Sequence, residues 1–534
     1  MIRDNLEQAL RDALARVGVA APASVQLERP ARREHGDWSS NVALAAARGA
    51  GRPPRELARE LADALSAEPH PHVESVEVAG PGFVNFRLRH SWLHDVLREV
   101  VEGGEGGYAV SNVGGGTRVN VEFVSANPVG PLHVGGGRWA AYGDALCRLL
   151  ERCGYQAHRE YYLNDRGVQM IFFGESLAAV RAGRPIPEGG YQGDYIAEWA
   201  AEMPADADAR EWGYQRAVRD LRESLERLGV RFDTWFSERS LVETGAIDAT
   251  LDDLRARGVV YEADGAIWLR TTDFGDDKDR VIVRSDGEFT YVLPDIAYHR
   301  DKFARGFALL IDVWGSDHHG YVKRLHAGVR ALCHDPADLE IVLGQFVQLT
   351  RDGQAVRLSK RAGDLVLLSD LIDAVGADVA RLTFLLQSID TRQTIDLDLV
   401  TSQAMENPVF YVQMAHARIA GISRVAAEHG LAVKPIAEVD LGLLADEREL
   451  EVLRVLSQLP EVLELACAER APHKVTTWVR ELASAFHGFY HDCYVVHPDV
   501  AEPLAQARMW LVESARTGLA IGLAILGVSA PDSM

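Results

Sequence analysis

A histidine beside three consecutive glycines is the first place in this chain where residue types and spacing suggest chemistry. In SANPVGPLHVGGGRWAAYGDA, residues 125–145, His133 is followed closely by Gly135, Gly136 and Gly137. Backbone N–H groups at the start of a helix favour a bound anion, and glycines let that anion approach closely. An imidazole can also hydrogen-bond a phosphate oxygen. The stretch therefore indicates a phosphate-binding turn, with an ordinary tight turn as the alternative on glycine content alone.

The residues around this stretch predict the elements that would hold it. Residues 117–124, TRVNVEFV, place Val119, Val121 and Phe123 on one face, which is typical of a strand. From residue 138 onwards apolar residues recur at helical spacing, so the glycines lie where a helix begins. The spacing matches neither a P-loop, which needs GK[ST] after the glycines, nor the GxGxxG fingerprint of dinucleotide-binding folds.

A run of positive charge lies more than two hundred residues further along the chain. In FVQLTRDGQAVRLSKRAGD, residues 346–364, a turn-like RDG precedes Arg357, Ser359 and Lys360. Taken alone, such a run indicates a solvated basic loop. If it shares a domain with His133, one end of that domain would cradle a nucleotide while the other neutralises its phosphates.

Composition and charge narrow the class of protein. The chain has 534 residues and a formal net charge of −22, which argues against indiscriminate nucleic-acid binding but leaves room for a local basic face. We find no apolar run long enough to span a bilayer and no signal peptide, and expect no membrane association. Five scattered cysteines without a CxxC favour a cytoplasmic protein without a disulfide framework, a zinc knuckle or any other protein-bound metal.

Three regions separate along the chain. Residues 1–105 combine a helix with two strand-like runs and end at a glycine-rich linker, EGGEGGYAVSNVGGG. Residues 116–390 alternate strand and helix patterns, which predicts an α/β domain with a parallel sheet covered by helices. Residues 395–534 are predominantly helical in pattern.

Several motifs resemble one enzyme family. HVGG at 133–136 resembles the HIGH signature of class I aminoacyl-tRNA synthetases, and RLSK at 357–360 resembles their KMSK signature. Further stretches resemble arginyl-tRNA synthetases in order and spacing: SANPVGPLHVG, YYLNDRGVQM, GSDHHGYVKRL, LSKRAGD, NPVFYVQMAHARI and LGVSAPDSM, with GDWSSNVAL and AGPGFVNFRL in the first region. The resemblance implies an N-terminal α+β domain that contacts tRNA over residues 1–105. It implies a Rossmann-like parallel-sheet catalytic domain over 116–390 and an all-helical anticodon-binding domain over 395–534.

The same resemblance implies a two-step reaction. Arginine and ATP, which brings Mg²⁺ with it, would form arginyl adenylate and pyrophosphate, and the arginyl group would then pass to tRNA(Arg). It assigns catalysis and ATP binding to residues of the two signatures: His133, Gly135, Gly136, Arg357, Ser359 and Lys360. Lys360, helped by Arg357, would neutralise the triphosphate and the leaving pyrophosphate, because fixed donors aimed at developing charge are usually the largest catalytic effect.

Arginine recognition is implied for a second set of residues: Glu122, Ser125, Asn127, Tyr291, Asp295, Asp317 and Glu238. Tyr291 and Asp295 would hold the guanidinium, with Glu238 as a second acid, because guanidinium groups pair with carboxylates in planar contacts.

The rest of this set would bind the α-amino and carboxylate groups, and Asp317 stands where some family members carry glutamine. Each of the residues also has a simpler interpretation. Asp295 could cap a helix starting at residue 296 and Tyr291 could be a core residue. Glu238 could be a surface acid, and Ser125 and Asn127 could be turn residues.

Two positions depart from the family pattern. Gly136 replaces the usual second histidine of HIGH, and Arg357 replaces the first lysine of KMSK. The glycine keeps open the alternative of a non-catalytic tRNA-binding paralogue. A class I synthetase of another specificity, or a related nucleotidyl transferase, is a third possibility. The leading hypothesis is a monomeric arginine–tRNA ligase.

Overall fold

The computed structural model describes residues 2–30, 32–356, 367–402 and 404–533 of the chain. These residues form two compact units, each of which combines distant parts of the sequence. The first unit contains Met1–Gly103, Val425–Ser457 and Gly488–Ser514, and the second contains Gly104–Arg424, Gln458–His487 and Ala515–Met534.

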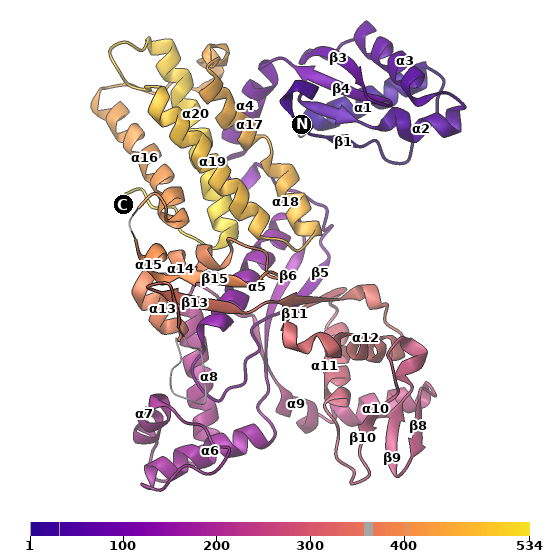
Figure 1. The fold of residues 1–534 in the computed structure, drawn as a ribbon, viewed down its shortest axis with the longest axis vertical. Helices are drawn as coiled ribbons and strands as arrows, with labels where there is room; N and C mark the ends of the chain where they lie inside the picture. Colours follow the sequence, from indigo (N-terminus) through magenta and orange to yellow (C-terminus); the bar gives the residue numbers. More distant parts are fainter. Residues whose placement is uncertain (1, 31, 357–366, 403, 534) are drawn as a thin grey trace. The chain divides into compact units, whose positions relative to one another are not determined.

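The first unit contains a four-stranded antiparallel sheet in the order β1-β2-β4-β3 (Figure 1). Its strands are β1 (Leu27–Glu28), β2 (Trp38–Ser40), β3 (Val73–Ala79) and β4 (Phe83–Leu88), and the helices before and between them are α1 (Ile2–Arg16), α2 (Val42–Ala50) and α3 (Pro54–Ala67). Gly82 in the tight β3–β4 turn has φ 146°, and a Cβ there would lie 2.9 Å from the Pro54 carbonyl oxygen. The turn between the two strands therefore requires glycine at this position.

The predicted glycine-rich linker is partly helical. Helix α4 (Ser91–Gly107) continues through EGGEGG, with a single break at Gly104, whose φ is 55°. The apolar residues of its first turns are buried, including Trp92, Leu93 and Leu97. Packing of this apolar face outweighs the low helix propensity of the glycines that follow.

The second unit is built on a five-stranded parallel sheet in the order β12-β11-β5-β6-β7 (Figure 1). The strands are β5 (Arg118–Glu122), β6 (Gln156–Leu163), β7 (Thr234–Ser237), β11 (Leu309–Gly315) and β12 (Leu339–Gly344). Helix α5 (Val134–Arg152) connects β5 to β6. This sheet with its covering helices confirms the predicted α/β class.

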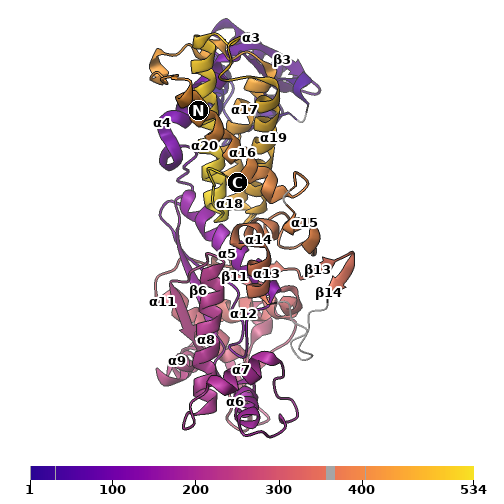
Figure 2. The same ribbon diagram turned by 90° about the vertical axis from the view of Figure 1, so that its left-hand side faces the viewer.

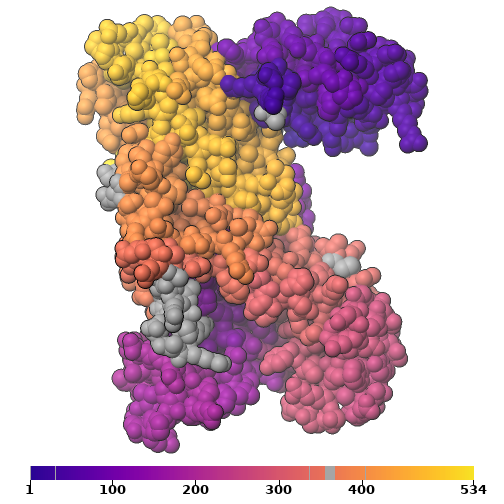
Figure 3. Space-filling view, in the orientation of Figure 1, coloured from indigo at the N-terminus to yellow at the C-terminus, as the bar shows by residue number. Residues whose placement is uncertain are grey.

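Two insertions separate the strands of this sheet. Between β6 and β7 lie α6 (Val168–Arg181), α7 (Asp194–Glu202) and α8 (Ala209–Arg227), which cluster around their own apolar core (Figures 1 and 2). Between β7 and β11 lie α9 (Glu238–Glu243), α10 (Ala246–Ala256), the antiparallel strands β8 (Val260–Ala263), β9 (Ala266–Leu269) and β10 (Arg280–Val283), and α11 (Val292–Ala304). On the face shown in Figure 3, a hollow separates the surfaces of the two insertions.

Shorter elements complete the second unit around the sheet. They are α12 (Val322–Ala331), a small sheet of β13 (Val347–Arg351), β14 (Gln354–Val356) and β15 (Gln393–Asp396), and the helices α13 (Leu368–Val375), α14 (Ala377–Phe384) and α15 (Leu397–Thr401). The 3₁₀ turns of the chain are η1 (Arg33–His35), η2 (Thr271–Phe274), η3 (Ser316–Tyr321), η4 (Pro336–Asp338), η5 (Ile436–Glu438) and η6 (Leu441–Leu443).

The last part of the chain is helical, as predicted. Its helices are α16 (Pro408–Glu428), α17 (Glu447–Leu456), α18 (Leu459–Ala468), α19 (His473–Asp492) and α20 (Glu502–Leu526). By length and composition α20 could span a membrane, so the expectation that no apolar run is long enough is wrong for this helix. In the fold, 72% of its most apolar stretch is buried within the chain, which is typical of a core helix.

Buried polar contacts of Asp144 and Arg138 hold α5 in place. Asp144 on α5 pairs with Arg381 Nη2 at 2.6 Å, Arg148 Nε at 2.8 Å and Arg159 Nε at 3.1 Å. Arg138, near the start of the same helix, donates to the carbonyl oxygens of Gln345, Ser388 and Thr391 at 2.7–2.9 Å. Partnered charges of this kind are costly to separate, so the helix is fixed at both its start and its middle.

Candidate functional site

Several predicted site residues that the structure describes lie at the carboxyl edge of the parallel sheet. The chain runs β5-β6-β7 in one direction from the centre and β11-β12 in the other, so the strand order reverses between β5 and β11. Open parallel sheets bind ligands at such a reversal, beyond the carboxyl ends of the strands. Glu122 ends β5, Glu238 follows β7 and Asp317 follows β11.

A strained turn follows β5. Val124 and Ser125 have φ of 69° and 39°, a region that a β-branched valine rarely adopts. The Ser125 hydroxyl donates to Glu122 Oε1 at 3.0 Å and accepts from the Tyr162 N–H at 3.1 Å. Asn127 Nδ2 donates to Gln169 Oε1 at 2.6 Å. Ser125 and Asn127 thus lie in a turn, and Ser125 also orients the Glu122 carboxylate.

His133 stands at the N-cap of α5, with the glycines in the first helical turn. A Cβ on Gly135 would lie 2.8 Å from His133 Cε1, so the ring lies against the backbone of that turn. His133 also forms an isolated β-bridge with Leu367, and the Leu368 N–H donates to the Leu132 carbonyl oxygen at 2.8 Å. Arg357, Ser359 and Lys360 lie outside the described residues, and Leu367 is the first described residue after them.

The space beside Gly136 is filled by a neighbouring side chain. A Cβ at this position would lie 2.5 Å from Leu132 Cδ1, and Leu132 is only 2% exposed. Glycine at position 136, where the HIGH pattern has histidine, therefore fits its surroundings, because Leu132 occupies the volume that a larger residue would need.

Tyr291 and Asp295 lie one helical turn apart at the start of α11. The helix begins at Val292, so the interpretation of Asp295 as the cap of a helix starting at residue 296 is wrong. Tyr291 is 77% exposed and is not a core residue. The Tyr321 hydroxyl donates to Asp295 Oδ2 at 2.5 Å, and burial raises the pKa of Asp295 to about 6.

Glu238 and Asp317 differ in their surroundings. Glu238 is buried at the start of α9, so it is not a surface acid, and Arg166 Nη1 lies 3.9 Å from its Oε1. Burial is the main cause that raises the pKa of Glu238. The Arg166 charge opposes this rise, and the Asp295 charge adds to it. Asp317 lies in η3 at the edge of the sheet, with 62% of its side chain exposed.

Three of the candidate carboxylates, together with Asp165, lie near Tyr162, a partly buried tyrosine. Burial is the main cause that raises the pKa of Tyr162, and the charges of Glu238, Asp295 and Glu122 raise it further. These acids come from three different elements, α9, α11 and β5. Lys302 and Arg166 offset part of the charge of Glu122 and Glu238, and the remaining repulsion among the acids favours a cationic ligand.

Sequence reasoning missed a buried charge network beside these acids. Lys302 on α11 donates to Glu122 Oε2 at 2.6 Å and to Asp312 Oδ1 at 2.9 Å. His299 Nε2 lies 2.8 Å from Asp312 Oδ2. The available signal was Asp312 itself, a charged residue in the otherwise apolar strand sequence LLIDVWG.

The charges of this network stabilise one another. Burial alone would lower the pKa of Lys302, but the charges of Asp312 and Glu122 raise it above its ordinary range. Burial opposes ionisation of Asp312, yet the Lys302 and His299 charges hold its pKa below the usual range. Burial raises the pKa of Glu122, and Lys302 opposes that rise.

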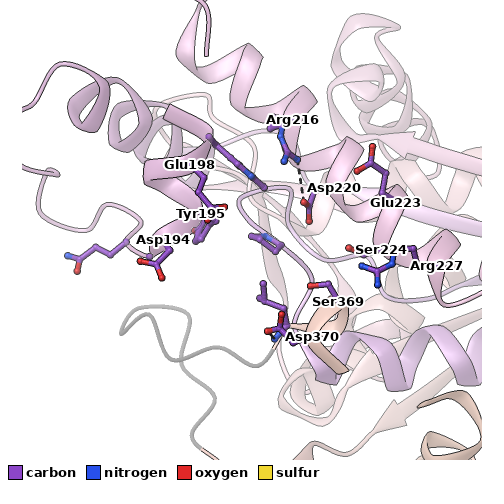
Figure 4. A pocket seen from close by; sticks show the side chains of 15 residues that line it. Asp194, Tyr195, Glu198, Arg216, Asp220, Glu223, Ser224, Arg227, Ser369 and Asp370 are labelled. Carbon is purple, nitrogen blue, oxygen red and sulfur yellow. Dashed lines mark hydrogen bonds and ion pairs between the residues drawn. The ribbon is translucent and has the colours of Figure 1, made fainter. Parts of the chain in front are cut away.

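A separate cavity of about 440 Å³ lies between α7, α8 and the start of α13 (Figure 4). None of the predicted arginine-binding residues lines it. Figure 4 shows that Arg216 and Asp220, which both line this cavity, point toward one another. Arg216 also pairs with Glu202. Because its arginines are engaged by neighbouring acids, the cavity gives no indication of a phosphate site. Among the described residues, no group of three His, Cys, Asp or Glu side chains could hold a metal ion.

Comparisons with known proteins cover the whole chain. Three family models match: "Arginyl tRNA synthetase N terminal domain" over residues 4–88, "tRNA synthetases class I (R), catalytic domain" over 206–420, and "DALR anticodon binding domain" over 412–534. An arginine–tRNA ligase of Frankia alni is 48% identical, covering 97% of this chain and 96% of that protein. An arginine–tRNA ligase of Bacillus subtilis is 42% identical, covering 100% and 99%.

Solved structures agree with these sequence matches. A putative arginyl-tRNA synthetase of Campylobacter jejuni is 32% identical with a TM-score of 0.75, covering 84% of this chain and 100% of that one. The arginyl-tRNA synthetase of Thermus thermophilus has a TM-score of 0.76 with full coverage of both chains. At 23% identity, the second likeness supports the fold alone.

The contact between Gly136 and Leu132 yields the first prediction. Gly136→Ala should lower the free energy of unfolding by about 1 kcal/mol, because overpacking costs about 1–3 kcal/mol and a helical Gly→Ala change gains about 0.5–1 kcal/mol. In a Leu132→Ala background the same change should be neutral or stabilising. Thermal and urea unfolding followed by circular dichroism measures both.

A control for helix propensity is available in α16. At Gly421 the nearest atom to an added Cβ is a flexible Arg424 nitrogen 3.8 Å away, so Gly421→Ala should stabilise the protein. Equal destabilisation by Gly136→Ala in both Leu132 backgrounds would contradict the assigned contact.

Proposed function

The chain belongs to the arginyl-tRNA synthetase family, and on that premise we propose that it ligates L-arginine to tRNA(Arg) at the carboxyl edge of the parallel sheet. In the first step an arginine carboxylate oxygen attacks the α-phosphorus of ATP, the bond to the pyrophosphate breaks, and arginyl adenylate forms. In the second step a hydroxyl of the terminal tRNA ribose attacks the arginyl carbonyl, and AMP leaves.

The observation that carries this proposal is the convergence of Glu122, Asp295 and Glu238 around Tyr162. Arginine carries two cations, an α-ammonium and a guanidinium, separated by an apolar stem. Asp295, with Tyr291 one turn before it, binds the guanidinium, and Glu238 is the second acid. Glu122 accepts from the α-ammonium. Ser125, Asn127 and Asp317 complete the contacts at the reacting end of the substrate.

The nucleotide binds at the start of α5. His133 and the N–H groups of Gly135 and Gly136 hold the phosphates, because the start of a helix favours an anion. The Gly136 N–H also donates to the His133 carbonyl oxygen at 2.9 Å, so a phosphate oxygen would share it. Lys360 and Arg357 neutralise the triphosphate and the leaving pyrophosphate, and Ser359 positions their loop. The β-bridge between His133 and Leu367 supports this assignment, since it holds the chain just after that loop beside the glycines. Mg²⁺ enters with ATP, bound through its phosphates.

The same proposal covers partners and compartment. The N-terminal region, residues 1–105, contacts tRNA, and the helical region, residues 395–534, binds the anticodon, with residues 116–390 as the catalytic domain. The enzyme acts as a monomer in the cytoplasm, where its five unpaired cysteine thiols remain reduced. A non-catalytic paralogue or another amino-acid specificity is disfavoured, because full-length relatives are arginine–tRNA ligases and the pocket keeps its acids.

Arginine-dependent ATP–pyrophosphate exchange, with and without tRNA, tests the proposed function directly. Exchange is expected with arginine in the presence of tRNA. Lysine and citrulline should give none, because lysine lacks the planar fork and citrulline lacks the charge. Folded protein that binds tRNA but exchanges with no amino acid would instead identify the non-catalytic paralogue.

Lys360→Ala should lower kcat about 100- to 1,000-fold, the usual effect of removing one donor from a developing anion. The KM for arginine should stay nearly unchanged, because Lys360 is assigned to the phosphates. Steady-state kinetics of exchange measures both constants, with Lys360→Arg as the charge-retaining control. An unchanged kcat in Lys360→Ala would remove this residue from the mechanism.

Asp295 sets a pH dependence. Its carboxylate must be ionised to pair with a guanidinium, so kcat/KM for arginine should fall as pH drops below the Asp295 pKa of about 6. Tyr321→Phe removes a donor that lowers this pKa, so the acid limb should move upward by about one pH unit. The other charged groups facing Asp295 are His299, Glu122 and Asp312. An acid limb that Tyr321→Phe leaves in place would show that another group controls it.

A further inference from the structure

A row of carboxylates crosses the three central strands. Glu122 on β5 is the register partner of Asp312 on β11 and of Glu160 on β6. Like charges directly opposite one another in neighbouring strands destabilise a sheet. All three side chains are buried, so cations from elsewhere must offset their repulsion.

Two cations, Lys302 on α11 and Arg305 directly after its end, meet this row separately. Lys302 contacts Glu122 and Asp312, at 2.6 and 2.9 Å. Arg305, three residues later, forms a two-pronged contact with Glu160 at 2.6 and 2.7 Å. Lys302 is the inner of the two, with a fully enclosed side chain whose ammonium lies 4.4 Å from the centre of the Tyr298 ring.

Glu122 is the member of the row that a substrate can reach. Its Oε2 accepts from Lys302 and its Oε1 accepts from the Ser125 hydroxyl, so both oxygens are held in one orientation. Nine per cent of its side chain remains exposed, whereas the side chains of Asp312 and Glu160 are fully enclosed. A carboxylate oxygen with one donor bound can accept another.

We propose that Lys302 is a positioning residue for amino-acid recognition: it holds Glu122 ionised and aimed at the α-ammonium of the substrate. The inference rests on the proposed binding role of Glu122. Without Lys302, Glu122 would lose the donor that fixes its Oε2 at 2.6 Å and the charge that opposes the effect of burial on its pKa, so it would attract an ammonium group more weakly. A buried ion pair contributes little net stability compared with well-packed apolar residues, although removing one partner alone is costly, so the test must separate a role in binding from one in folding.

Lys302 also reaches the opposite end of the pocket through other residues. Asp312 contacts His299 Nε2 at 2.8 Å, and His299 Nδ1 lies 2.7 Å from the Asp295 carbonyl oxygen. If Lys302 only maintained the local structure, its loss would therefore weaken recognition of the guanidinium and of the ammonium together. The proposal requires that only ammonium recognition is lost.

A pair of ligands separates these two cases. L-Arginine carries the α-ammonium, whereas 5-guanidinopentanoate has the same guanidinium, stem and carboxylate without it. Isothermal titration calorimetry on the full chain with tRNA bound gives the affinity for each ligand. In Lys302→Met we expect arginine to bind about 10- to 100-fold more weakly, the usual loss for a hydrogen bond to a charged group. The affinity for 5-guanidinopentanoate should change less than about threefold on the same basis.

Two further variants make the result decisive. Arg305→Gln removes the neighbouring ion pair on the same helix, and we expect it to leave the ratio of the two affinities unchanged. Glu122→Gln should reproduce the selective loss of arginine binding. In one outcome, Glu122→Gln weakens arginine binding selectively while Lys302→Met weakens the binding of both ligands equally, or of neither. That result overturns the role of Lys302 and leaves the role of Glu122 intact. If Glu122→Gln is not selective, the proposed function of Glu122 itself fails.

Lys302→Gln covers the case in which Lys302→Met does not fold. Glutamine keeps a donor for the two carboxylates but removes the charge, so the same selective loss of arginine binding is expected once circular dichroism shows a native fold. An affinity ratio equal to that of the unsubstituted protein would overturn the proposal, because hydrogen bonding alone would then suffice.

Discussion

The ammonium of Lys302, enclosed between Glu122 and Asp312, is the interaction on which the site depends. It allows acids to stand side by side in the centre of a parallel sheet, where the strand order reverses and a ligand can enter. Without it, the sheet would place two like charges in register with no water to screen them. The position of α11 against β5 and β11 follows from the same contacts.

From this arrangement the electrostatic character of the pocket follows. The deeper acids are neutralised from within by Lys302 and Arg305, while Asp295 and Glu238 face the pocket with pKa values raised by burial. In the proposed function, a substrate with cations at both ends would neutralise these outer acids, adding to the Arg166 charge 3.9 Å from Glu238. Selection would then depend on charge at two points, separated by a distance that the sheet and α11 fix together.

Local patterns predicted the elements well, because apolar periodicity reports directly on which face is buried. The sequence of β5, the glycine turn and α5 was readable in this way, and the start of α11 was misjudged by only a few residues. The contacts of Lys302 could not be predicted from the sequence, because they depend on strand register and on how α11 packs against the sheet. Helical packing likewise extended α4 through glycines whose composition indicates a linker. The contact of Leu132 with Gly136 depends on side-chain packing that no motif encodes.

The contrast between fixed and exposed groups indicates how the site works. Helix α5 is held by Arg381 and Arg138, and the turn after β5 stays in a strained conformation at Val124 that only a rigid surrounding can maintain. Tyr291, by contrast, is largely exposed beside this frame. Groups that stabilise developing charge must be fixed in advance, because reorganising them during the reaction would raise the barrier. In the proposed site, the glycine turn and Glu122 would meet that requirement through buried charges, which would leave adaptation to the substrate to exposed residues such as Tyr291.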